Sequence, residues 1–354
     1  MDKTQKLKED YPWIQTPLVV GAPMRLIALA DMAVEISKAG GIGFIGAGTD
    51  VSDVRSHLDK ATHLVESSSL ATTTTANTLP LGIGFINWGA DLSAAIALIG
   101  EYRPAAVWFF APSSLSSLQT WATQTRAASP ATKIWVQIGS VHEALDALAS
   151  IQPDVLVVQG SDAGGHGLAR SASLLTLLPE VDDAVGSGSR ASSSSLSGPA
   201  LVAAGGISDA RGAAAALVLG AQGVCMGTRF LASPEANLSA GYRACVLRAT
   251  DGGQATARTA VYDSLRGTPL WPHTHNARAI LNASYWDHVA GLPLEENKAL
   301  YQKDLASGDA GWAENGRMTA YAGSGVGLVR GVKGAGEIVG EVREGARGLL
   351  LGRG

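Results

Sequence analysis

Eight short apolar runs recur along the first two thirds of the chain, and this recurrence constrains the fold more than any other feature. Each run has four to six residues, and most are rich in β-branched or aromatic side chains. Such runs are typical of parallel strands that are buried on both faces. The runs cover residues 17–20, 42–45, 81–86, 105–110, 134–138, 155–158, 201–204 and 223–226.

A helical pattern or a long connection follows each run, and this alternation predicts the architecture. Eight successive β/α units indicate an α/β fold of the closed (β/α)8, or TIM barrel, type, whose chemistry lies on the loops after the strands. With 354 residues the chain exceeds the usual single core, which favours an insertion. We therefore expect a barrel over residues 1–233, a small, mainly helical inserted lobe over 234–312, and a C-terminal return to the barrel over 313–354.

Composition excludes several classes of partner. The net charge of -4, the pI near 6.0 and the lack of a Lys/Arg run argue against nucleic acid. Cys225 and Cys245 lack metal-ligand spacing and indicate a reducing compartment. The start MDKTQKLKEDYPW has no secretory core, no run reaches the ~18 residues of a membrane span, and LLLGRG is not a peroxisomal signal. A soluble cytoplasmic protein without a membrane partner is expected.

Residues 154–167, DVLVVQGSDAGGHG, combine a buried strand with a glycine run and a histidine. The glycines around Gly164 allow the backbone to approach a ligand. His166 then lies on a glycine loop at the mouth of the strand, where an imidazole suits proton transfer near neutral pH. A capped loop histidine is the alternative, but the strand-end position favours the catalytic interpretation.

Two further glycine turns follow the seventh and eighth strands and predict an anion site. AAGGIS, residues 203–208, contains Gly205 and Gly206 just before a helix that begins near Asp209. CMGTR, residues 225–229, adds a second glycine turn with the hydroxyl of Thr228. In barrels this pair of loops commonly binds a phosphate through backbone amides and the helix dipole. Tight turns that merely need glycine are the alternative.

Several other motifs and residues are interpreted as parts of the fold and not as parts of a functional site. The GxGxxG match over residues 41–46 has its strand inside the glycine pattern, so a Rossmann phosphate loop is disfavoured. His273 and His275 have no third ligand nearby, so no metal site is expected. Trp271, Trp286 and Trp312 either pack or roof a pocket. Residues 186–198 are rich in Gly and Ser and predict a mobile surface loop. A second loop is predicted over 268–276. Helices are predicted over 243–248 and 276–286.

Taken together, five motifs resemble those of the nitronate monooxygenases, formerly called 2-nitropropane dioxygenases. The motifs are GAPM (21–24), VQGSDAGGHG (158–167), AAGGI (203–207), MGTRF (226–230) and a late AGSG turn (322–325). Their order and spacing extend over roughly residues 17–328. The resemblance implies an FMN-dependent TIM barrel with a small lobe. It also implies oxidation of alkyl nitronates by O2 to a carbonyl compound and nitrite.

The resemblance also implies roles for individual residues. His166 matches the catalytic histidine, and the glycine turns match the part that holds the FMN phosphate. Asp162 stands where the family often has Glu, and the loop over 186–198 is unusually long. The positions that correspond to cofactor contacts are Ala22, Pro23, Met24, Asn87, Gln159, Gly164, Gly205, Gly206, Cys225, Met226, Gly227, Thr228 and Ser324.

Two other functions stay open at this point. A flavin-dependent enoyl-acyl-carrier-protein reductase shares the glycine and histidine motifs but needs NAD(P)H. A non-catalytic flavin-binding barrel is the second alternative, because a fold does not determine a function. The expected partners are a small nitronate or nitroalkane and O2, and homodimer formation is left open.

Overall fold

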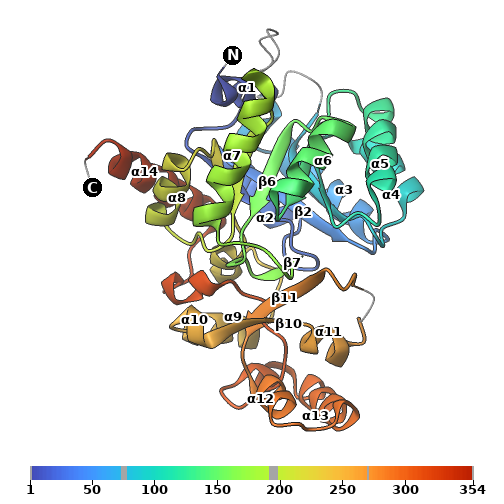
Figure 1. The fold of residues 1–354 in the computed structure, drawn as a ribbon, viewed down its shortest axis with the longest axis vertical. Coiled ribbons are helices and arrows are strands. Elements are labelled where there is room, and N and C mark those ends of the chain that lie inside the picture. The colour runs from blue at the N-terminus through green and yellow to red at the C-terminus, as the bar shows by residue number, and fades with distance from the viewer. Residues whose placement is uncertain (1, 73–77, 191–197, 269–270, 353–354) are drawn as a thin grey trace.

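The computed structural model describes residues 2–72, 78–190, 198–268 and 271–352. Eight parallel strands close into a barrel in the order β1-β2-β3-β4-β5-β6-β8-β9, which confirms the predicted α/β TIM barrel (Figure 1). The barrel strands are β1 (Leu18–Gly21), β2 (Ile42–Gly48), β3 (Leu79–Ile86), β4 (Pro104–Phe110), β5 (Lys133–Ile138), β6 (Val155–Gln159), β8 (Ala200–Ala204) and β9 (Gly223–Met226). Each of the eight predicted runs lies in or overlaps one of them.

The barrel closes where the first strand meets the last. Val20 of β1 pairs with Ile42 of β2 on one side and with Cys225 of β9 on the other. Aromatic rings fill the interior: the Phe44 ring lies 5.1 Å from that of Trp135 and 5.3 Å from that of Trp108, between centroids. Burial on both faces explains why these strands read as continuous apolar runs.

Helices alternate with the strands and cover the outside of the barrel (Figure 1). They are α1 (Lys3–Asp10), α2 (Ala30–Lys38), α3 (Val54–Glu66), α4 (Leu92–Tyr102), α5 (Leu115–Ala128), α6 (Val141–Ile151), α7 (Leu174–Arg190), α8 (Ala210–Val218) and α14 (Ala335–Leu350). Asp91, Ser140 and Asp209 cap α4, α6 and α8 by accepting backbone N–H hydrogen bonds. Within the described ranges, none of the helices has the length and apolar character needed to cross a membrane.

The loop predicted over residues 186–198 is wrong in its first part. Helix α7 continues to Arg190, and residues 191–197 lie outside the described part of the chain. The helix carries an apolar face of which Leu178, Val181 and Val185 are buried. This spacing of three and four residues stabilises the helix as far as Val185, and the helix continues from there to Arg190.

The inserted lobe is mainly helical, as predicted, but it contains two strands that the sequence did not reveal. Its elements are α9 (Ala240–Arg248), α10 (Gly252–Ala255), β10 (Thr256–Thr259), α11 (Val261–Arg266), β11 (His275–Ile280), α12 (Ala283–Val289) and α13 (Leu294–Ala306). Short 3-10 helices are η1 (Ser69–Thr72), η2 (Thr228–Ala232), η3 (Gly308–Trp312) and η4 (Ser324–Leu328). The helix predicted over 276–286 is wrong up to residue 280, because Ala277 and Ala279 alternate with Arg278 at the period of a strand.

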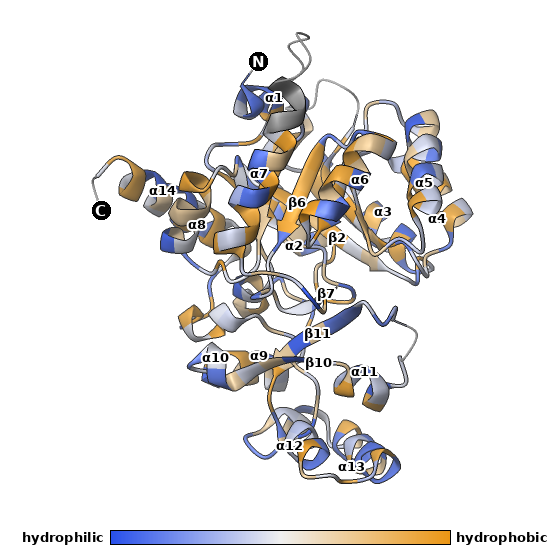
Figure 2. Ribbon diagram, in the orientation of Figure 1, coloured by the Kyte–Doolittle hydropathy of each residue, from blue (hydrophilic) through white to orange (hydrophobic). Residues whose placement is uncertain are grey.

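His166 lies on a strand and not on a glycine loop, which corrects the sequence prediction. Strand β7 (Gly165–Leu168) forms an antiparallel sheet with the lobe in the order β10-β11-β7, and His166 pairs with Ala277. Figure 1 shows this sheet between the barrel and the helices α12 and α13. Figure 2 shows that β11 is hydrophilic, unlike the barrel strand β6, so its sequence lacks the apolar signal of a buried strand.

Candidate active site

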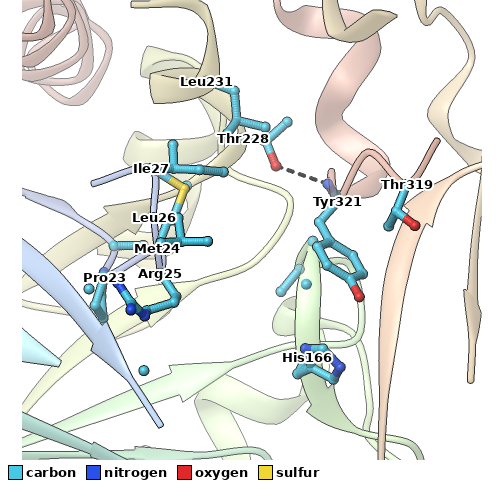
Figure 3. A pocket seen from close by; sticks show the side chains of 18 of the residues that line it. Pro23, Met24, Arg25, Leu26, Ile27, His166, Thr228, Leu231, Thr319 and Tyr321 are labelled. Carbon is cyan, nitrogen blue, oxygen red and sulfur yellow. Dashed lines mark hydrogen bonds between the residues drawn. The ribbon is translucent and has the colours of Figure 1, made fainter. Parts of the chain in front are cut away.

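A cavity of about 940 Å³ opens at the carboxyl ends of the barrel strands and is bordered by the lobe. This volume is within the range of small-molecule sites. Figure 3 shows side chains of residues 23–27 on one side of the cavity and Tyr321 with His166 on the other. The position agrees with the rule that TIM barrels carry their chemistry after the strands.

The structure brings most of the predicted site residues together. Eleven of them line this one cavity: Ala22, Pro23, Met24, Gln159, Gly164, His166, Gly205, Gly206, Cys225, Gly227 and Thr228. Three do not line it. Met226 is buried in β9, Ser324 donates a hydrogen bond to Asp162 Oδ1 at 2.7 Å, and Asn87 Oδ1 accepts one from the Phe110 amide at 2.7 Å. Asn87 Nδ2 is buried without a partner among the described residues.

The two glycine turns have the geometry of an anion cradle. Gly205 and Gly206 have φ of +103° and +76°, a region that side chains disfavour. A Cβ on Gly205 would lie 2.9 Å from the Gly160 carbonyl oxygen. The turn leads into helix α8, where the Arg211 and Gly212 amides already donate to Asp209 Oδ1 and are therefore not free for the predicted anion. In the second turn, which follows the neighbouring strand β9, the Thr228 hydroxyl accepts a hydrogen bond from the Gly323 amide at 2.9 Å (Figure 3).

His166 contacts a buried carboxylate from the lobe. Its Nε2 lies 3.0 Å from both oxygens of Asp263, which is in α11 and only 4% exposed. The Tyr321 hydroxyl donates a hydrogen bond to Asp263 Oδ1 at 3.1 Å. The indole of Trp271 stacks on the imidazole with centroids 3.8 Å apart and planes inclined by 8°. His166 is therefore held by a carboxylate and by an aromatic face.

Burial sets the protonation of the groups around this histidine. Burial raises the pKa of Tyr321, and the Asp263 carboxylate raises it further, so the hydroxyl stays protonated and donates. Burial, with contributions from His166 and Arg258, lowers the pKa of His275 to about 4. His275 is thus neutral near pH 7. Burial and the neighbouring Arg278 lower the pKa of Arg258 to about 10.

Two arginines of the lobe sheet hold the segment that joins β6 to β7. Arg278 Nε and Nη2 donate hydrogen bonds to the Ser161 carbonyl at 3.2 and 3.1 Å. Arg258 Nη1 donates to the Ala163 carbonyl at 3.4 Å, and its Nε and Nη2 donate to Oδ1 and to the carbonyl of Asn276 in β11 at 2.9 and 2.6 Å. These contacts fix the backbone before His166.

Sequence reasoning missed Asp263, the carboxylate that contacts His166. Asp263 is 97 positions away from it and belongs to no motif. Trp271 and Trp312 line the cavity, whereas Trp286 is 55% exposed. Among the described residues there is no group of three or more His, Cys, Asp or Glu side chains that could hold a metal ion.

Comparison with solved structures gives matches over nearly the whole chain. A nitroalkane oxidase from Streptomyces ansochromogenes has a TM-score of 0.72 and 22% identity, covering 98% of this chain and 99% of the other. FabK from Thermotoga maritima has a TM-score of 0.70 and 22% identity, covering 98% and 97%. At such identities the likeness establishes the fold alone.

Sequence comparison is more specific. The nitronate monooxygenase family model matches residues 97–345. The chain is 47% identical to the nitronate monooxygenase npaC of Metarhizium robertsii, over 98% of this chain and 95% of the relative. It is 36% identical to a nitronate monooxygenase of Neurospora crassa, over 97% and 92%. The chain therefore belongs to the nitronate monooxygenase family of oxidoreductases, whose members depend on a flavin.

Proposed function

We propose that this protein binds FMN in the cavity described above and oxidises alkyl nitronates with O2, releasing a carbonyl compound and nitrite. The observation that carries the proposal is the meeting of His166 and both glycine turns in one cavity. A small flavin-dependent oxidoreductase needs both features, a place for the cofactor and a titratable group beside the substrate.

The residues present fit a flavin mononucleotide. Gly205 and Gly206 line the cavity with a positive-φ backbone that carries no side chain, so a phosphate could approach their main chain closely. Ala22, Pro23 and Met24 offer an apolar wall to a flat ring. When bound, the flavin supplies the electron chemistry, taking electrons from the substrate and returning them to O2.

His166 supplies the charge and the proton transfer that the substrate requires. A nitronate is an anion, so an imidazolium at this position would hold it in place. A neutral nitroalkane first has to lose its α-proton, and the same imidazole is the base within the cavity. The Asp263 carboxylate lines the same cavity and lies 3.0 Å from Nε2, and we assign it as the hydrogen-bond partner of the histidine and not as the base.

The visible absorption spectrum of the purified protein tests the proposal first. We expect a yellow protein that releases FMN on denaturation, and whose flavin absorbance bleaches when a nitronate is added without oxygen. Oxygen should restore the absorbance and yield nitrite. A colourless protein, or a flavin that NAD(P)H bleaches and nitronates do not, would overturn the proposal and favour a reductase.

A further inference from the structure

We propose that Asp263 is a positioning residue that fixes the tautomer of His166 and thereby makes Nδ1 the atom that exchanges a proton with the substrate. The proposal rests on the proposed function, because it concerns the same cavity. It assigns a task to a residue of the lobe that lies 97 positions away from the histidine it controls.

The first step of the argument concerns hydrogen-bond chemistry. An ionised carboxylate can only accept hydrogen bonds, so an imidazole nitrogen at 3.0 Å from both Asp263 oxygens carries the hydrogen. A neutral imidazole has one N–H and one free lone pair. With the hydrogen on Nε2, the lone pair is on Nδ1. Within the described part of the chain Nδ1 has no hydrogen-bond partner, and His166 lines the cavity.

The second step concerns rigidity, because Asp263 can fix the tautomer of His166 only if the carboxylate and the imidazole are both held in place. Asp263 is buried, and the Tyr321 hydroxyl donates to its Oδ1 at 3.1 Å. The nearly parallel Trp271 ring, 3.8 Å away, defines the plane of the imidazole. Pairing of His166 with Ala277 fixes the backbone. Each contact comes from a different element, so the imidazole has little freedom to rotate.

The third step considers the other titratable and charged groups around the histidine. His275, on β11, is kept neutral by burial, which lowers its pKa to about 4. Arg258, on β10, is engaged with Asn276, and Arg266 lies with its guanidinium carbon 5.5 Å from the Tyr321 ring centroid. None of these groups accepts a hydrogen bond from Nε2. Among the described residues, Asp263 is the carboxylate within ion-pair distance of His166.

The chemistry follows from this arrangement. In a nitroalkane the α C–H bond breaks, its proton forms a new bond to Nδ1, and the electron pair delocalises onto the nitro group to give the nitronate. His166 becomes an imidazolium beside the anion, and the Asp263 carboxylate stabilises the positive charge through its contact with Nε2. A preformed nitronate skips the proton transfer, so it depends less on the tautomer.

Nitrogen-15 NMR on the flavin-loaded protein tests the tautomer directly. The protein is labelled with [15N]histidine, and the His166 signals among the seven histidines are identified by their loss in His166→Asn. We expect the wild-type spectrum near neutral pH to show the hydrogen on Nε2 and a bare Nδ1. A hydrogen on Nδ1 in the wild type would overturn the proposal, and this measurement requires no Asp263 variant to fold.

The substitution Asp263→Asn adds a second test. The amide can donate to Nε2, which moves the hydrogen to Nδ1, as in serine proteases where the corresponding change lowers kcat by about 10⁴. Here we expect the tautomer to change and turnover of a neutral nitroalkane to fall by about 10²-fold or more, with a smaller loss for its nitronate. An unchanged tautomer, or equal losses for the two substrates, would reduce Asp263 to a structural role and contradict the proposal.

Asp287→Asn is the matched control, since it makes the same change in the lobe at a carboxylate that pairs with Arg317 outside the cavity. It should leave the His166 signals unchanged. The NMR result is independent of turnover. If the wild-type tautomer is as expected but nitronates do not bleach the flavin, the proposed function fails and the positioning role stands.

Discussion

At the scale of single residues, the proposed chemistry depends on His166, which lines the cavity and contacts the Asp263 carboxylate. We expect His166→Asn to retain the flavin, because the histidine is separate from the glycine turns, while turnover of a neutral nitroalkane falls by about 10²–10⁴-fold. Flavin content and nitrite release measure the two effects. The matched control is His142→Asn, at an exposed histidine on α6. Undiminished turnover in His166→Asn would remove the imidazole from the mechanism.

Gly206 illustrates a residue whose backbone, not its side chain, serves the site. Its φ of +76° disfavours any Cβ, and a Cβ there would lie 3.0 Å from Asp162 Cβ. We expect Gly206→Ala to lower the unfolding free energy by about 1–2 kcal/mol and to weaken flavin retention. In contrast, Gly340→Ala in α14 meets no atom within 4 Å and should raise stability by up to about 1 kcal/mol. Urea unfolding of both variants tests this difference in sign.

At the scale of elements, the sheet β10-β11-β7 joins His166 to the lobe. Arg278 anchors it through two hydrogen bonds to the Ser161 carbonyl, which only a forked guanidinium can make at once. We expect Arg278→Lys to keep the charge but to cost about 1–2 kcal/mol of unfolding free energy and to reduce turnover. Arg330→Lys, at an exposed arginine outside the cavity, should change neither quantity. Equal stability of the two variants would contradict the anchoring role.

The unfolding free energy should also depend on pH through His275 of strand β11. Burial lowers the pKa of His275 to about 4 from an ordinary 6.5, so between these values the unfolded chain binds a proton that the folded chain does not. Stability therefore falls as the pH is lowered through this window. We expect His275→Gln to lose less unfolding free energy than the wild type between pH 6.5 and pH 4. Thermal unfolding across the window measures the slopes, and identical slopes would argue against a buried neutral histidine.

Elements that bury much apolar area could be predicted from the sequence, and elements that bury little could not. Each barrel strand is a continuous apolar run, so all eight were found, together with the glycine turns that follow them. Strand β7, with the sequence GHGL, has no such run and forms through pairing with β11. Asp263 could not be predicted, because its meeting with His166 depends on how the lobe folds over the barrel and not on local spacing.

At the scale of the whole molecule, the cavity is a joint product of the barrel and the lobe. The barrel loops supply the glycine turns and the wall at residues 22–24, and the lobe supplies Asp263, Trp271 and the strand that orients His166. A cofactor held by the barrel would thus lie beside a histidine that the lobe aligns. Disruption of either the barrel loops or the lobe should therefore affect both the retention of the cofactor and its reaction with substrate.

Cofactor binding should therefore stabilise the folded chain as a whole. If FMN binds only the folded state, a concentration one hundred times its Kd raises the unfolding free energy by about 2.7 kcal/mol. Urea unfolding of the cofactor-free protein at increasing FMN concentration measures this. Riboflavin has the same ring without the phosphate, so it should need a far higher concentration for the same stabilisation if the turns at Gly206 and Gly227 hold the phosphate. Equal stabilisation by riboflavin and FMN would contradict the anion cradle while leaving the ring site intact.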